Sequence, residues 1–294
     1  MRTRPIDGML LVDKPAGPTS HDVVAVVRRA LGERRIGHAG TLDPFATGLL
    51  VLLVGRATRL LPYIDAEPKE YEATVRFGAE TDTDDLTGTV VSTAPLPGRD
   101  AVENAIAKLT GEILQLPPAY SAKKVGGRRA YAAARKGQVV ALVAAPVSVY
   151  RWEVRAWRED EIDVTITCGT GTYVRSLARD VGRLAGSGAH LTALRRSRSG
   201  PFTVADAFTL DSVKRGEAQL RPALDAVRSL PMERLSDVAL SLVATGRSVE
   251  ATIPGPRAAL VDAAGTLVAI AEREGDGEGK EGARWHPRLV LRDA

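Results

Sequence analysis

The feature of this sequence that most constrains its fold is an uninterrupted apolar run, residues 49–54, directly after a glycine-punctuated loop, residues 37–48. A short apolar run bounded by glycines suits a strand that is covered on both faces. Loops beside a rigid buried element commonly carry functional side chains. We therefore predict a core built around this strand, with residues 37–48 held at its end.

The other expected elements mix helices and strands. Residues 71–77 and 161–167 alternate polar and apolar side chains at period two, which is typical of half-buried strands. A helix should begin after Thr19 or Ser20, both good capping residues, and end at Gly32. Further elements are a strand at residues 8–12 and helices at residues 100–109 and 172–185. Because strands and helices do not alternate regularly, the sequence predicts an α+β fold with a largely antiparallel sheet flanked by helices.

The last part of the chain has the pattern of a separate small module. A boundary is expected near the Ser-Leu-Pro segment at residues 229–231. The module should contain a helix at residues 235–245 and short strands at residues 259–261, 267–271 and 288–291. The acidic, glycine-rich residues 272–282 suit a hairpin tip. We predict a main domain at residues 1–228 and a β-rich domain at residues 229–294.

One stretch of the chain is strongly basic. The net charge is only +4, yet residues 121–137 contain no acidic residue. Its cations are Lys123, Lys124, Arg128, Arg129, Arg135 and Lys136. Solvated protein faces usually mix both signs of charge, so this stretch favours contact with nucleic acid over an ordinary exposed face.

Several protein classes are disfavoured by the composition. No apolar run approaches the roughly 20 residues that cross a bilayer, and the apolar residues 9–12 are too few for a signal peptide. We therefore expect a cytoplasmic protein. Cys168 is the only cysteine, which excludes an intramolecular disulfide and a thiolate zinc site, and the four histidines are scattered. No metal is expected.

Asp43 is the candidate catalytic residue in the glycine-rich loop. Pro44 disfavours the helical region for Asp43 and so holds it in extended geometry. Three glycines allow sharp turns and close approach of a ligand. An Asp-Pro pair in such a loop is often only a turn, so position alone leaves both interpretations open.

The loop sequence GHAGTLDPFATG at residues 37–48 resembles the signature of the TruB family of tRNA pseudouridine synthases. Five further segments resemble the family in its order: LLVDKPAGPTSHD at 10–22, KEYEATVRFGAETDTDD at 69–85, LPPAYSAKKVGGRRAYAAARKG at 116–137, CGTGTYVRSLARDVG at 168–182 and GAHLTALRR at 188–196. The resemblance covers residues 8 to about 210 and implies a pseudouridine-synthase-type sheet. The C-terminal module resembles a PUA-type RNA-binding domain more loosely.

The resemblance implies roles for individual side chains around the target uridine. Asp43 matches the catalytic aspartate of the family. Tyr71 matches the tyrosine that stacks on the target base and assists proton removal. Tyr173 and Arg175 match residues that pack beside the base and pair with the catalytic carboxylate.

Three more residues match supporting positions of the family. His38 matches the histidine that helps displace the uridine from its stack. Lys14 matches the motif that supports the catalytic loop. Leu194 matches a hydrophobic wall of the uridine pocket.

The chemistry of pseudouridine formation agrees with this set of residues. Moving the ribose from N1 to C5 of uracil needs no redox step and no group carrier, so no cofactor is expected. A carboxylate can attack C1′ as a nucleophile or remove the C2′ proton as a base, and both alternatives stay open. We expect Arg175 to form a bidentate pair with Asp43 and to lower its pKa.

The resemblance implies the isomerisation of the T-loop uridine at position 55 of tRNA, by a monomer without guide RNA. An insertion at about residues 117–146 would hold the T arm. One alternative is a synthase that modifies ribosomal RNA within a guide-RNA particle. Another is a non-catalytic RNA-binding protein that folds tRNA.

Overall fold

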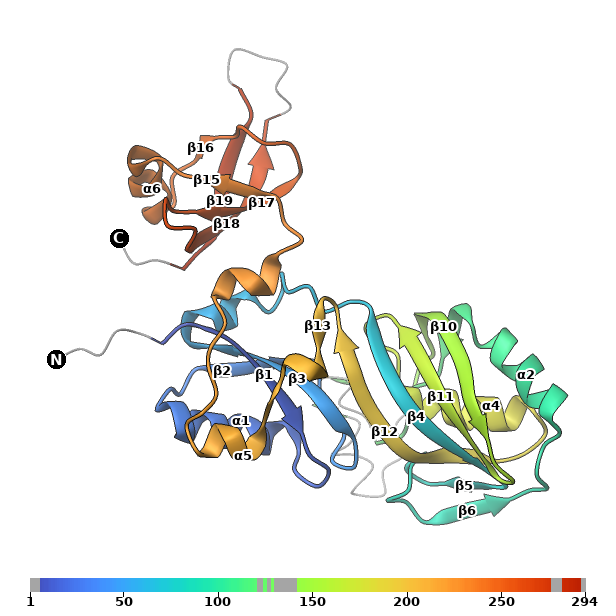
Figure 1. Ribbon diagram of the computed structural model, residues 1–294. Coiled ribbons are helices and arrows are strands. Elements are labelled where there is room, and N and C mark those ends of the chain that lie inside the picture. The colour runs from blue at the N-terminus through green and yellow to red at the C-terminus, as the bar shows by residue number, and fades with distance from the viewer. Residues whose placement is uncertain (1–5, 121–123, 126–127, 130–141, 276–281, 292–294) are drawn as a thin grey trace.

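The computed structural model describes residues 6–120, 124–125, 128–129, 142–275 and 282–291. Its largest element is a ten-stranded sheet with the order β14-β1-β3-β12-β4-β11-β10-β7, in which β2 also pairs with β3 and β13 with β12 (Figure 1). The strands are β1 (Gly8–Lys14), β2 (Ile36–Ala39), β3 (Thr47–Val54), β4 (Lys69–Phe77), β7 (Gly111–Gln115), β10 (Ala145–Trp157), β11 (Glu161–Cys168), β12 (Ala189–Ser199), β13 (Phe202–Thr203) and β14 (Phe208–Thr209). Only β1–β14 and β3–β12 are parallel pairs in this sheet. The predicted largely antiparallel α+β fold is thus confirmed.

Strand β3 is the centre of the sheet's N-terminal half. Every residue from Gly48 to Val54 is buried. Helices α1 (Ser20–Leu31) and α5 (Leu210–Lys214) cover one face of β3, and the 3-10 helices η1 (Gly55–Leu60) and η3 (Ala223–Val227) pack on the other. The prediction of a strand covered on both faces is confirmed.

Helix boundaries follow the local capping chemistry. Helix α1 begins after Thr19, whose side chain forms a capping box with Asp22, and ends at Gly32 in the left-handed conformation, as predicted. Helices α2 (Arg99–Lys108) and α4 (Val174–Leu184) pack on the sheet's C-terminal half. Helix α4 starts two residues later than predicted because the backbone of Tyr173 is extended.

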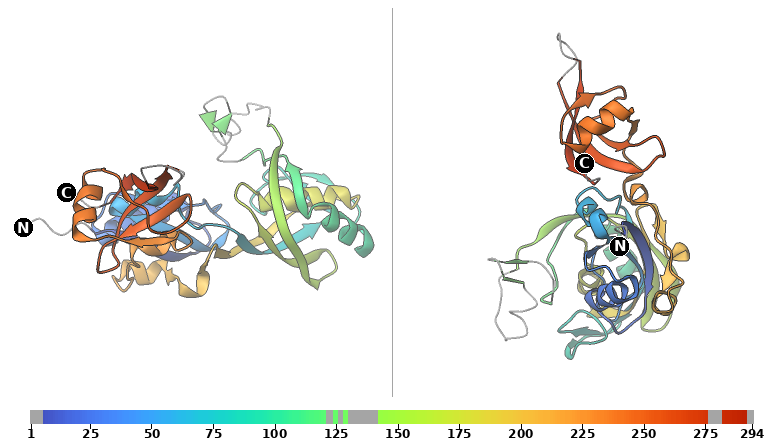
Figure 2. Two further views of the ribbon diagram at one scale, coloured as in Figure 1. Left: turned by 90° about the horizontal axis from the view of Figure 1, so that it is seen from above. Right: turned by 90° about the vertical axis from the view of Figure 1, so that its left-hand side faces the viewer.

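The C-terminal segment forms a second sheet with the order β15-β17-β18-β19-β16. Its elements are β15 (Met232–Arg234), α6 (Asp237–Ala244), β16 (Val249–Glu250), β17 (Arg257–Val261), β18 (Leu267–Glu274) and β19 (Arg284–Val290). Antiparallel β18 and β19 form the predicted hairpin, and residues 276–281 at its tip lie outside the described residues. Residues of this sheet share one apolar cluster with β1, β3, η1 and η3, so the second sheet packs against the main domain at the end where these 3-10 helices lie (Figures 1 and 2).

Two small strand pairs lie outside the two large sheets. Strands β5 (Ala79–Thr81) and β6 (Val90–Thr93) form one pair. Strands β8 (Lys124–Val125) and β9 (Arg128–Arg129) form the other and stand apart from the main sheet (Figure 2). Among the helices in the described ranges, none combines the length and the apolar character needed to cross a membrane.

Candidate active site

The loop that carries Asp43 is held in place by two buried polar side chains. Lys14 donates hydrogen bonds from Nζ to the carbonyls of Pro44 (3.1 Å) and Ala46 (2.6 Å), on either side of Phe45. Ser20, the first residue of α1, exchanges two hydrogen bonds with the backbone of Leu42, at 2.9 and 3.0 Å. The loop is therefore fixed both to β1 and to the N-terminus of α1.

Arg175 on α4 forms a bidentate ion pair with Asp43. Its Nε lies 2.9 Å from Oδ2 and its Nη2 lies 3.1 Å from Oδ1. The same guanidinium donates to the carbonyls of Thr83 (2.8 Å) and Tyr120 (2.9 Å), and its Nη1 lies 3.6 Å from the carboxylate of Asp85. Every side of this buried cation is thus paired, which fixes its orientation.

The pKa of Asp43 departs from the expectation. Burial raises the pKa of its carboxyl, and Asp85 acts in the same direction. Arg175 and Lys14 lower it but do not outweigh the loss of solvation. The prediction of a lowered pKa was wrong because it counted the ion pair and left out burial.

A pocket of about 250 Å³ opens beside Asp43. Four other predicted site residues line it together with Asp43: Tyr71, Tyr173, Arg175 and Leu194. They come from β4, from the N-terminus of α4 and from β12, so the pocket lies where three elements meet. A cavity of this size is below the range of pockets for drug-sized ligands, and it suits a single nucleobase.

Both tyrosines of the pocket are held in place by neighbouring groups. Tyr71 is 7% exposed, and burial raises the pKa of its phenol, against the opposite effect of Arg196. The backbone of Tyr173 is bound on both sides by the amide of Gln115, which accepts from its N–H at 2.8 Å and donates to its carbonyl at 3.1 Å. The pocket therefore presents a neutral phenol and a fixed Tyr173 backbone.

His38 and Lys14 lie outside the pocket lining. His38 is on β2, and its Nδ1 is buried without a hydrogen-bond partner among the residues that the structure places. Burial lowers the pKa of His38, and the nearby His21 and Arg196 act in the same direction, so its imidazole is uncharged at neutral pH. Burial also lowers the pKa of Lys14, to about 8.

Three buried residues that hold the site together were not among the site residues predicted from the sequence. Asp85 faces Arg175, Gln115 binds Tyr173, and Arg196 donates to the carbonyls of Leu49 (2.8 Å) and Gly40 (3.1 Å). In the sequence, Arg196 stands only at the end of the family-like segment at residues 188–196. Strand alternation could have found it, because it lies two residues after Leu194 and therefore on the same face of β12.

The predicted RNA-binding cations fall into two groups. Lys123, Arg135 and Lys136 lie outside the described residues. The other three belong to a short antiparallel pair of strands: Lys124 in β8, and Arg128 and Arg129 in β9. Their contact with nucleic acid stays a prediction.

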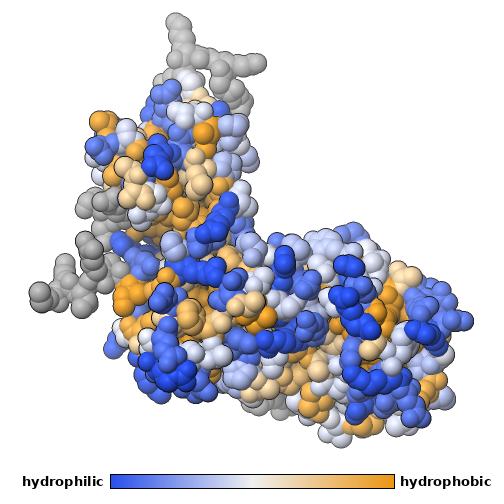
Figure 3. Space-filling model, in the orientation of Figure 1, coloured by the Kyte–Doolittle hydropathy of each residue, from blue (hydrophilic) through white to orange (hydrophobic). Residues whose placement is uncertain are grey.

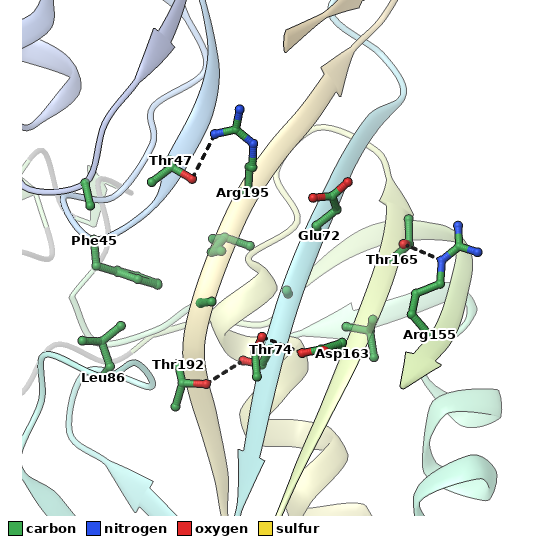
Figure 4. A pocket seen from close by; sticks show the side chains of 15 residues that line it. Phe45, Thr47, Glu72, Thr74, Leu86, Arg155, Asp163, Thr165, Thr192 and Arg195 are labelled. Atoms are coloured by element: carbon green, nitrogen blue, oxygen red, sulfur yellow. Dashed lines mark hydrogen bonds between the residues drawn. The ribbon is translucent and has the colours of Figure 1, made fainter. Parts of the chain in front are cut away.

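A larger hollow of about 720 Å³ lies on the opposite face of the sheet (Figure 4). Glu72 and Thr74 line it, whereas the alternate β4 residue Tyr71 lines the pocket beside Asp43. Several polar groups of this hollow bind one another, as in the 2.8 Å hydrogen bond from Thr74 to Asp163. Asp43, Tyr71 and Tyr173 line only the smaller of the two pockets.

Comparison with protein families assigns most of the chain. Residues 28–174 match the TruB family pseudouridylate synthase N-terminal domain, and residues 175–235 match the tRNA pseudouridylate synthase B C-terminal domain. The tRNA pseudouridine synthase B of Nocardia farcinica (strain IFM 10152) is 48% identical over 283 residues, which are 93% of this chain and 92% of that protein. The protein of the same name from Thermobifida fusca (strain YX) is 47% identical over 277 residues, 90% of this chain and 94% of that one.

Solved structures show the same fold. A chain in the structure of an H/ACA RNP bound to a substrate RNA containing 2′-deoxyuridine is 25% identical, with a TM-score of 0.71, over 97% of this chain and 85% of that one. A chain in a Cbf5-Nop10-Gar1 complex is 26% identical, with a TM-score of 0.72 and the same coverage. With family matches and identities of this extent, the chain belongs to the TruB family of pseudouridylate synthases and is an isomerase.

Proposed function

We propose that this protein isomerises the uridine at position 55, in the T loop of tRNA, to pseudouridine. The observation that carries the proposal is the bidentate Asp43–Arg175 pair beside a pocket for one base, with Tyr71 in its wall. The names of the 47–48% identical relatives supply the RNA class, tRNA. The T loop and position 55 come from the resemblance of the motifs.

The target base must leave its stack to reach Asp43. Unstacking and unpairing cost a few kcal/mol, and stacking on an aromatic ring such as Tyr71 returns about 1–3 kcal/mol. Leu194 supplies an apolar wall. His38, uncharged and with a free ring nitrogen, is suited to fill the place that the uridine leaves.

Asp43 starts the rearrangement in its ionised form. Arg175 occupies one lone-pair site on each carboxylate oxygen, so each oxygen keeps another for the substrate. If Asp43 attacks C1′, the C1′–N1 bond breaks as the bond from Asp43 to C1′ forms, and that new bond breaks when C5 of the rotated uracil bonds to C1′. If Asp43 removes the C2′ proton, the C1′–N1 bond breaks to leave a C1′=C2′ double bond, and the proton returns to C2′ as C5 bonds to C1′. In both routes C5 then releases its own proton. The raised pKa makes Asp43 a stronger base and nucleophile than an ordinary aspartate.

The remaining parts of the chain bind the RNA in this proposal. The basic insertion at residues 117–146 holds the T arm by shape and phosphate contacts, and residues 229–294 act as a PUA-like RNA-binding domain. The protein works in the cytoplasm as a monomer and without guide RNA. The likeness to proteins of H/ACA and Cbf5 complexes favours a guide-RNA particle as the second candidate, but their identity is 25–26%, against 47–48% for the tRNA enzymes.

One experiment separates these functions. The purified protein alone is incubated with an unmodified tRNA transcript that carries tritium at uracil C5, and the tritium released to water is counted. We expect release that depends on the uridine at position 55. Release only after a guide RNA is added would support the second candidate. Tight binding without any release would instead indicate an RNA-folding protein.

A further inference from the structure

Four exposed arginines gather where α1 ends and the chain turns into β2: Arg28, Arg29, Arg34 and Arg35, called here the α1 arginine cluster. Within residues 28–35 the only acid is Glu33, whose carboxylate accepts the backbone N–H of Arg35 at 2.7 Å. In Figure 3, the end of the main domain where α1 lies carries hydrophilic residues beside apolar ones. The cluster is therefore a concentrated positive surface.

The cluster lacks the pairing that many other surface arginines have. Arg28 donates to the carbonyl of Ile36 at 3.1 Å, and within the described ranges no carboxylate forms an ion pair with any of the four arginines. Paired surface arginines include Arg99 with Glu103, Arg158 with Glu161, Arg183 with Glu80, Arg215 with Glu217 and Arg228 with Asp225. Unneutralised charge in one place is what an anionic partner requires.

Helix stability explains only half of the cluster. Arg28 and Arg29 lie in the last turn of α1, where cations interact favourably with the helix dipole. Arg34 and Arg35 lie beyond Gly32, which ends the helix, so the dipole does not account for them. No contact in the described residues gives the guanidinium groups of Arg34 and Arg35 a structural role. We therefore consider that they bind a partner.

Two elements fix how far the cluster lies from the catalytic loop. Helix α1 starts at Ser20, which is hydrogen-bonded to Leu42, and its 12 residues make it about 17 Å long at 1.5 Å per residue. Strand β2 lies between Arg35 and Gly40, which are five residues apart and so about 17 Å apart at 3.3 Å per residue. Both elements hold the cluster at a fixed distance from Asp43.

We propose that the α1 arginine cluster binds backbone phosphates of a double-stranded RNA stem that leads away from the flipped uridine. The inference rests on the proposed function and adds a contact surface to it. A separation of about 17 Å corresponds to about six base-pair steps of an A-form RNA duplex at about 2.8 Å each, beyond the nucleotides next to the target. Arginine suits this role because its fork of N–H donors matches phosphate oxygens.

The test compares RNA affinity as a function of salt in an Asp43→Asn background, where no turnover occurs. Two hairpins carry the same T loop, one with a stem of about ten base pairs and one with about three, which is too short to reach the cluster. The test variant is Arg34→Gln/Arg35→Gln, since neither residue is in the helix. The control is Arg99→Gln/Arg158→Gln, which removes the same charge from paired arginines at the far end of the sheet (Figure 1).

For the long hairpin, we expect the test variant to bind more weakly than the control. Because two phosphate contacts are lost, the affinity of the test variant should also depend less on salt. Between 50 and 200 mM salt, its affinity should fall by a factor about ten times smaller than that of the control. The short hairpin should bind both variants equally. The proposal would be overturned if the two variants bound the long hairpin equally. It would also be overturned if the test variant lost the same affinity for the short hairpin as for the long one. Thermal unfolding of each variant checks its fold, and tritium release by the wild-type protein tests the proposed function separately.

Discussion

The guanidinium of Arg175 binds both carboxylate oxygens of Asp43, at 2.9 and 3.1 Å, across 132 positions of sequence. This ion pair joins the loop before β3 to the N-terminal turn of α4. The predictions for the site rest on three observations. Asp43 is paired with Arg175, the Asp43 side chain is partly exposed, and Asp85 lies beside the same guanidinium.

Replacing Asp43 by asparagine should abolish turnover and spare RNA binding. The amide keeps the shape of the side chain but is neither a base nor a nucleophile. We expect kcat to fall by several orders of magnitude while Kd for tRNA stays within a few-fold of the wild-type value, measured by tritium release and by filter binding. A variant that kept a tenth of the wild-type activity would show that Asp43 is not the catalytic group.

Replacing Arg175 by lysine should lower kcat far more than it changes KM. A lysine cannot form the bidentate pair, and the carbonyls of Thr83 and Tyr120 would lose their donors. Since 34% of the Asp43 side chain is exposed, solvent compensates part of the loss, and we expect about 2 kcal/mol of destabilisation. Steady-state kinetics and chemical denaturation measure the two effects. Unchanged kcat would mean that the orientation of the carboxylate does not matter.

Activity should fall at acid pH with an apparent pKa above that of an ordinary aspartate. Only the ionised form of Asp43 acts, and burial and Asp85 raise its pKa above 3.8. In an Asp85→Asn variant, one of the two effects that favour the protonated form is removed, so the acid limb of kcat should move to lower pH. The pH profiles of both proteins test this, and a limb that moves to higher pH would refute the assigned direction.

Lys14 should make the folded protein more stable as the pH rises above 8. Its pKa is about 8 in the folded protein, against 10.5 for an ordinary lysine, so between these pH values the unfolded chain holds a proton that the folded protein has released. The free energy of unfolding therefore rises with pH across this window. The full effect is about 3 kcal/mol. Chemical denaturation of the wild type and of a Lys14→Met variant at several pH values measures this effect. If the difference in unfolding free energy between the two proteins did not change with pH, the prediction would be contradicted.

Gly48 should tolerate no side chain. Its φ of +100° is unfavourable for other residues, and a Cβ there would lie 2.3 Å from the carbonyl oxygen of Arg196. Gly17 has a similar φ of +104° with nothing within 4 Å, so Gly17→Ala isolates the backbone strain. We expect Gly48→Ala to cost about 2 kcal/mol more than Gly17→Ala in chemical denaturation. Equal costs would mean that β3 and β12 can shift apart freely.

Local sequence was enough for the elements whose cause is local. Period and length identified β3 as a doubly covered strand, and capping residues placed both ends of α1. The start of α4 could not be predicted, because the extended backbone of Tyr173 depends on Gln115, 58 positions away. Local sequence also could not distinguish two adjacent arginines: Arg195 pairs with Asp13 at the surface, whereas Arg196 is buried and lines the pocket.

The sequence by itself determined the glycine-rich loop, its proline-restricted aspartate and the motifs that resemble one family, because these depend on neighbouring residues. The tertiary structure alone decided which side chains meet Asp43 and in which direction its pKa moves. Burial, Arg175 and Asp85 act on that carboxyl through space and in opposing directions. Their balance is set by the packing of β1, β3, β12 and α4, which no local pattern encodes.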